Sequence, residues 1–108
     1  MRLSELLDHD NIIIQCHNDP DADAIASGYA LYTWFRKMNK NVRLIYSGRS
    51  QISKPNLIMM IKELNIPIEY VESMDRFDGL LITVDCQYGA GNVKKFEAAH
   101  IAIIDHHQ

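Results

Sequence analysis

The chain has 108 residues, 47% of them hydrophobic, and a net charge of −3, which fits one globular domain and excludes a disordered segment. This acidic balance offers no basic surface for gripping long nucleic acid, and no apolar run approaches the ~18 residues of a membrane helix. The first residues, Met1–Glu5, lack the apolar stretch of a signal peptide.

Two cysteines, Cys16 and Cys86, are too few for a disulfide scaffold. We expect reduced thiols in a cytoplasmic protein, with metal ligation as the alternative.

Predicted strands and helices alternate through the first part of the chain. Residues 11–16 form an isoleucine-rich run typical of a buried strand. Residues 22–38 have the apolar spacing of a helix, with Asp21 at the N-cap position. A strand over 42–46 and a helix over 55–64 follow, and Pro55 suits the first turn of that helix.

The alternation continues to the last residues. Residues 67–71 predict a short edge strand, Asp78–Gly79 a turn, and residues 80–84 a strongly apolar strand. A helix over 92–99 and a strand over 101–104 complete the pattern. Apolar strands alternating with helices predict a doubly wound α/β fold, with a mainly parallel five-stranded sheet and helices on both faces.

Aspartate and histidine follow three of these predicted strands. They are His17, Asp21 and Asp23 after the first strand, Asp85 after the fourth, and Asp105, His106 and His107 after the fifth. Ligands of such sheets bind beyond the carboxyl ends of the strands. We therefore expect these side chains to meet at one edge of the sheet.

Carboxylate and imidazole groups together favour Mn²⁺, Mg²⁺ and related ions, and the lack of a thiolate pair argues against a structural zinc site. The set exceeds the need of one ion, and two metals about 3.5–4 Å apart are the usual solution for phosphoryl hydrolysis. Each group also has a purely structural interpretation by itself. Asp21 and Asp23 suit helix capping, Asp85 suits a turn, and the histidine pair suits a surface strand end. Their coincidence at three strand ends favours a metal site.

The segment His17–Ser27, followed by Asp85 and then by Asp105–His107, resembles the motifs of the DHH phosphoesterase superfamily. Members of this superfamily include RecJ-type exonucleases, oligoribonucleotide and phosphoadenosine-phosphate phosphatases, cyclic-dinucleotide phosphodiesterases, exopolyphosphatases and manganese-dependent inorganic pyrophosphatases. Ala26 stands where many members have glycine, a mild departure because only a small residue is needed there. The resemblance covers almost the whole chain.

This resemblance implies a set of metal ligands. His17 and Asp21 would bind one Mn²⁺, Asp23 and His106 would bind a second, and Asp85 would bridge both. Mg²⁺ or Co²⁺ are the expected substitutes for Mn²⁺. No organic cofactor is expected.

The resemblance also implies which groups act on the substrate. His107 would lie beside the scissile phosphate as proton donor or charge stabiliser, and Asp85 would hold the metals that activate water. Asp105 would orient the histidines from behind.

The activity that the resemblance implies is metal-dependent hydrolysis of phosphodiester or phosphomonoester bonds in short oligoribonucleotides or nucleotide phosphates. The alternatives are an inorganic pyrophosphatase or exopolyphosphatase, which cleave phosphoanhydrides, and a non-catalytic module that senses metal or nucleotide. Expected partners are a small phosphorylated substrate and, as a candidate, a second copy of the chain, but no long nucleic acid and no membrane.

Superfamily members carry a fourth metal-binding aspartate and a C-terminal substrate-binding domain, and neither follows Gln108. We therefore interpret residues 1–108 as the N-terminal catalytic domain of a longer protein, nearly inactive by itself.

Overall fold

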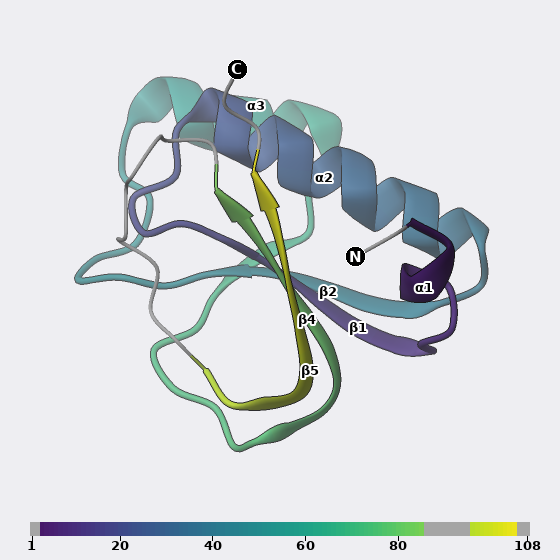
Figure 1. Ribbon diagram of the computed structural model, residues 1–108. Coiled ribbons are helices and arrows are strands. Elements are labelled where there is room, and N and C mark those ends of the chain that lie inside the picture. The colour runs from purple at the N-terminus through teal and green to yellow at the C-terminus, as the bar shows by residue number, and fades with distance from the viewer. Residues whose placement is uncertain (1–2, 86–95, 106–108) are drawn as a thin grey trace.

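The computed structural model describes residues 3–85 and 96–105, and at residues 3, 4, 85 and 105 it describes the backbone alone. Within these residues the chain forms a five-stranded parallel sheet in the order β3-β2-β1-β4-β5 (Figure 1). The elements are α1 (Leu3–Leu6), β1 (Asn11–Cys16), α2 (Ala22–Lys37), β2 (Asn41–Tyr46), α3 (Pro55–Leu64), β3 (Ile68–Tyr70), β4 (Phe77–Asp85) and β5 (Ala98–Asp105). The predicted α/β class and parallel sheet are confirmed. The bounds of β1 and α3 are those predicted, and β3 lies at a sheet edge as expected.

The core lies on both sides of the sheet because alternate residues of a strand point to opposite faces. Ile12 and Ile14 of β1 pack in the larger cluster, together with Phe35 of α2 and Leu57 of α3. Ile13 belongs to a smaller cluster on the opposite face. Helices α2 and α3 therefore cover the same face, as Figure 1 shows.

Gly28 brings α2 close to that face. A Cβ at this position would lie 2.9 Å from Leu44 Cδ1 and 3.0 Å from Cys16 Sγ, so a larger residue would require these buried side chains or the helix to shift. Helix α2 begins at Ala22, two residues before its first buried residue, Ala24. Its N-terminus points toward the carboxyl ends of the strands.

Two predictions in the second half of the chain are wrong. Asp78 and Gly79 form part of β4 rather than a turn, with a register shift between Phe77 and Leu80. Glycine is needed there because a Cβ would collide with the carbonyl oxygen of Asn11. The strand can therefore begin earlier than the apolar pattern indicated.

The helix predicted over 92–99 is also wrong at its end. Ala98 and Ala99 belong to β5, where Ala98 pairs with Phe77. Pairing with β4 outweighs the helix propensity of alanine, which is a weak preference. The remainder of that prediction, 92–95, lies outside the described residues. Helices were expected on both faces of the sheet, and the described helices α1, α2 and α3 all contribute to the larger cluster on one face.

Strand order places the ends of three strands side by side. The chain runs from β1 outward to β3, then crosses to β4 on the other side of β1, so the direction of winding changes between β1 and β4. This change is where α/β sheets bind ligands. Cys16 of β1 pairs with Val84 of β4, and Asp85 pairs with Asp105 of β5.

No helix among the described residues is long and apolar enough to cross a membrane.

Candidate metal centre

His17 is the first residue after β1, and its side chain is completely buried. Its ring nitrogen Nδ1 lies 2.8 Å from the carbonyl oxygen of Asn18. A proton on Nδ1 donates to this oxygen and leaves a lone pair on Nε2. Nε2 is buried and has no hydrogen-bond partner among the described residues. An imidazole oriented through one nitrogen, with the other available, is the usual arrangement of a metal-binding histidine.

Asp21 begins α2 as its N-cap, which confirms the predicted capping position. Its Oδ1 accepts a hydrogen bond from the backbone N–H of Ala24 at 2.9 Å. Capping thus uses one carboxylate oxygen, and the structural and metal-binding interpretations of Asp21 are compatible.

Asp23 lies in the first turn of α2, where a carboxylate also complements the helix dipole. Its side chain is exposed and has no hydrogen-bond or ionic partner in the described part of the chain. Asp23 and Asp21 therefore both present carboxylate oxygens at the N-terminus of α2, on the loop that follows His17.

The remaining predicted ligands lie at or beyond the ends of β4 and β5. The backbone of Asp85 ends β4, one position past the Cys16–Val84 pair, so it lies beside His17 across the two strands. The backbone of Asp105 ends β5 and pairs with Asp85. His106 and His107 lie outside the described residues. Within residues whose side chains are described, no group of three or more histidine, cysteine or acidic side chains is placed to hold a metal ion.

A second buried polar group lies next to His17 and was missed by the sequence reasoning. Ser47 directly follows β2 and is 1% exposed, and its hydroxyl has no hydrogen-bond partner in the described residues. The same holds for the Oδ1 atom of Asn18. The two loops touch, since a Cβ on Gly48 would lie 3.2 Å from that of Asn18. The only sequence signal for Ser47 was its place directly after a buried strand, the place that His17 occupies after β1.

Two tyrosines shape the loop that follows β2. Tyr70 donates a hydrogen bond to the carbonyl oxygen of Gly48 at 2.6 Å, and Tyr46 accepts one from the N–H of Ile52 at 2.8 Å. Partial burial, and next the negative charge of Glu72, raise the pKa of Tyr70 above its ordinary value of 10.0. Tyr70 therefore remains a hydrogen-bond donor to this loop throughout the neutral range.

Cys16 is buried directly before His17, and its thiol donates to the carbonyl oxygen of Ala24 at 3.5 Å. This contact ties β1 to the first turn of α2. Cys86, like the stretch that follows it, lies outside the described residues.

The structure places the backbones of five motif residues at the carboxyl ends of the strands. His17, Asp21 and Asp23 lie on the loop after β1 and the start of α2, and Asp85 and Asp105 end neighbouring strands. The family model for the DHH family, N-terminal domain, matches residues 11–108. The chain belongs to the DHH family. Comparison with curated proteins and with solved structures gave no match.

Membership in the DHH family sets the general chemistry of the domain. DHH proteins are generally metal-dependent phosphohydrolases. The matched range of the DHH domain includes every aspartate and histidine that the sequence singled out, from His17 to His107. The buried, unpartnered Nε2 of His17 fits such a metal-binding role in this chain.

Proposed function

We propose that this DHH domain is the catalytic part of a Mn²⁺-dependent phosphoesterase. The observation that carries the proposal is the buried His17 imidazole, oriented by the Asn18 carbonyl and with Nε2 unpartnered among the described residues. Burying an imidazole nitrogen without a partner is unfavourable, on the order of 1–3 kcal/mol. A metal at Nε2 removes that cost, and the adjacent end of β4 supplies a second ligand in Asp85.

The proposed ligand set has two parts. His17 and Asp21 would hold one ion, Asp23 and His106 would hold the other, and Asp85 would be a ligand that the two ions share. Asp21 keeps its capping bond through Oδ1, so binding through its other oxygen leaves the helix start intact.

The residues around the ions have separate roles in this proposal. Two bound cations supply hydroxide from water near neutral pH and offset negative charge at phosphorus. His107 donates a proton to the leaving group or stabilises the charge on the phosphate. Asp105 acts through the histidines by holding their rings in position.

The substrate we favour is a short oligoribonucleotide or a nucleotide phosphate, with the ester bond to phosphorus being cleaved. A net charge of −3 supports a small substrate, because it offers little attraction for a long polyanion. Inorganic pyrophosphate or polyphosphate is the second candidate. We further propose a cytoplasmic protein in which a C-terminal domain completes the substrate grip.

A screen of product release with Mn²⁺ tests this function. AMP is measured for the diadenylate, because cleavage of its phosphodiester bond yields AMP rather than inorganic phosphate, and inorganic phosphate is measured for the other substrates. The substrates are 5′-phosphorylated diadenylate, 3′-phosphoadenosine 5′-phosphate, pyrophosphate and polyphosphate, each with Mn²⁺ and with a chelator. We expect Mn²⁺-dependent release from a nucleotide substrate. This release should be lost in His17→Gln and retained in His9→Gln, a matched change before the amino end of β1. Release that is insensitive to chelator, or unchanged in His17→Gln, would refute the proposal. Faster release from pyrophosphate would select the second candidate.

A further inference from the structure

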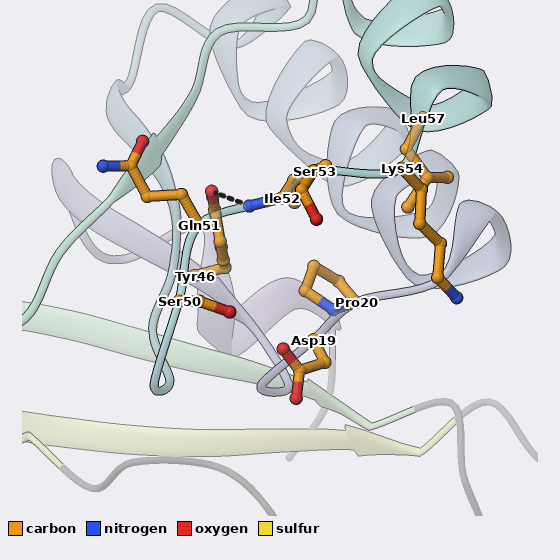
Figure 2. A pocket seen from close by; sticks show the side chains of 9 residues that line it. All are labelled: Asp19, Pro20, Tyr46, Ser50, Gln51, Ile52, Ser53, Lys54 and Leu57. Atoms are coloured by element: carbon orange, nitrogen blue, oxygen red, sulfur yellow. Dashed lines mark hydrogen bonds between the residues drawn. The ribbon is translucent and has the colours of Figure 1, made fainter.

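A pocket of about 270 Å³ opens beside the proposed metal centre. Figure 2 shows the side chains that line it, between the loop after β1 and the segment that leads into α3. We call it the Asp19 pocket, after the carboxylate at its rim. Its size lies just below the usual range for small-molecule sites, about 300–1,000 Å³, and suits one small group rather than a polymer.

The polar groups of the Asp19 pocket are mostly hydroxyl and carboxylate oxygens. Asp19 and Ser50 lie at the same rim in Figure 2, and Ser53 lies on the α3 side. Asp19 is exposed and has no hydrogen-bond or ionic partner in the part of the chain that the structure describes. Its backbone has φ 51, a left-handed conformation that is uncommon outside glycine and concentrated at functional sites.

Two common ligand groups fit this lining poorly. A phosphate needs positive charge, but the ammonium of Lys54 lies apart from Asp19 and Ser50 in Figure 2, and the Asp19 carboxylate at the rim would repel an anion. A nucleobase needs a flat aromatic surface on which to stack. The only aromatic side chain of the lining, Tyr46, is 5% exposed.

A sugar ring fits the same lining well. Its hydroxyls donate to the carboxylate of Asp19 and exchange hydrogen bonds with the serine hydroxyls. Its C–H face would contact Ile52, the partly exposed apolar residue of the lining, since Pro20 and Leu57 are buried like Tyr46. Tyr46 accepts the N–H of Ile52 and so fixes that wall before any ligand binds.

We propose that the Asp19 pocket binds the ribose of the nucleotide whose phosphate lies at the metal centre, with Asp19 accepting a hydrogen bond from the 2′-hydroxyl. This inference rests on the proposed function and specifies its substrate as a ribonucleotide. Asp19 is two residues from His17, so their Cα atoms lie at most about 7 Å apart. Adjacent positions on this loop thus serve adjacent parts of one nucleotide.

Paired ribose and deoxyribose probes test the proposal. Equilibrium dialysis measures binding of AMP and of 2′-deoxy-AMP, and the rate of mononucleotide formation compares 5′-phosphorylated diadenylate with its 2′-deoxy form. We expect the ribose form to be favoured in both assays by about ten-fold, the ratio for one hydrogen bond to a charged group. In Asp19→Asn the preference should fall toward one. Asparagine tolerates the left-handed backbone, so the loop is preserved.

The ratio between the two sugars is an internal control. Damage to the neighbouring metal loop lowers both substrates alike and cancels in the ratio. Asp75→Asn removes another exposed carboxylate, in the loop before β4, and should keep the full preference. Equal binding of AMP and 2′-deoxy-AMP by the unmodified protein would overturn the proposal, as would an unchanged preference in Asp19→Asn.

The outcome separates this proposal from the proposed function. Hydrolysis of both diadenylates at equal rates would refute ribose recognition and leave the phosphoesterase activity intact. A preference for AMP that Asp19→Asn abolishes, with no hydrolysis of any substrate, would support the pocket and refute the activity.

Discussion

The two ends of the parallel strands, here called the amino edge and the carboxyl edge, differ in whether buried polar atoms lack partners. At the amino edge polar groups are paired: Lys40 Nζ donates to the Leu7 carbonyl at 2.7 Å, and Asn41 donates to Asn11 at 3.1 Å. At the carboxyl edge the buried atoms His17 Nε2 and Ser47 Oγ have no partner among the described residues. Both edges are built from the same strands, so the difference lies in the loops.

This contrast separates polar groups that stabilise the fold from polar groups reserved for a ligand. An unpartnered buried polar atom costs free energy in the ligand-free protein. Such a cost is tolerated where binding later supplies the partner, and strained or unsatisfied groups cluster at functional sites for that reason. Under the proposed function, the amino edge serves folding and the carboxyl edge binds the metal.

The largest expected effect is on activity at the carboxyl edge. If Asp85 bridges two cations, Asp85→Asn removes a negative charge that both ions require. A loss of several kcal/mol of charge stabilisation corresponds to a drop of about a thousandfold or more in kcat/KM. Asp105→Asn, on the neighbouring strand end, should cost less because Asp105 acts through the histidines. Steady-state kinetics of both variants measure this, and equal activity of Asp85→Asn and the unmodified protein would remove the two-metal mechanism.

Metal-linked stability gives the next largest effect. Mn²⁺ at one hundred times its dissociation constant should raise the free energy of unfolding by about 2.7 kcal/mol. His17→Gln should abolish most of this gain, whereas His9→Gln should retain it. Thermal unfolding with and without Mn²⁺ measures both. Equal stabilisation of the two variants would place the metal elsewhere and break the contrast between the edges.

Stability without metal sharpens the comparison further. Lys40→Met at the amino edge should lower the free energy of unfolding by about 1–2 kcal/mol, because it removes a charged hydrogen bond to a backbone carbonyl. Ser47→Ala should leave stability unchanged or raise it by up to about 1 kcal/mol, since it removes an unsatisfied hydroxyl. Urea titration measures both variants. A greater loss in Ser47→Ala than in Lys40→Met would show that Ser47 is structural.

The smallest effect is a pH dependence at the carboxyl edge. Because the pKa of Tyr70 is raised in the folded protein, its stabilising contribution is fully present below the ordinary value of 10.0. This contribution is lost as pH rises through the higher folded-state pKa. In Tyr70→Phe the alkaline fall in the unfolding midpoint should become shallower, as measured by thermal unfolding across the alkaline range. An identical alkaline profile in Tyr70→Phe would show that the burial of Tyr70 and the charge of Glu72 do not couple its ionisation to stability.

Local patterns predicted the elements whose signals are local. Three local signals were sufficient: the isoleucine run of β1, Pro55 at the start of α3 and the capping carboxylate of Asp21. Each of them influences the backbone only a few residues away. The motif spacing identified His17, Asp21 and Asp23 as one group, because the helix that follows β1 keeps them together.

Only the tertiary structure decided which distant residues meet. Gly79 is strand rather than turn because β4 passes close to Asn11, and Ala98 is strand because it pairs with Phe77. Ser47 is buried because its loop lies against Asn18.

The Asp19 pocket forms between segments about thirty residues apart in the chain, and no local preference encodes that proximity. The sequence by itself determined the α/β class and the chemistry of the strand ends, because periodicity and residue type are local properties. The packing of two loops decided which polar atoms are buried without partners, because burial depends on contacts between parts of the chain that local rules do not relate.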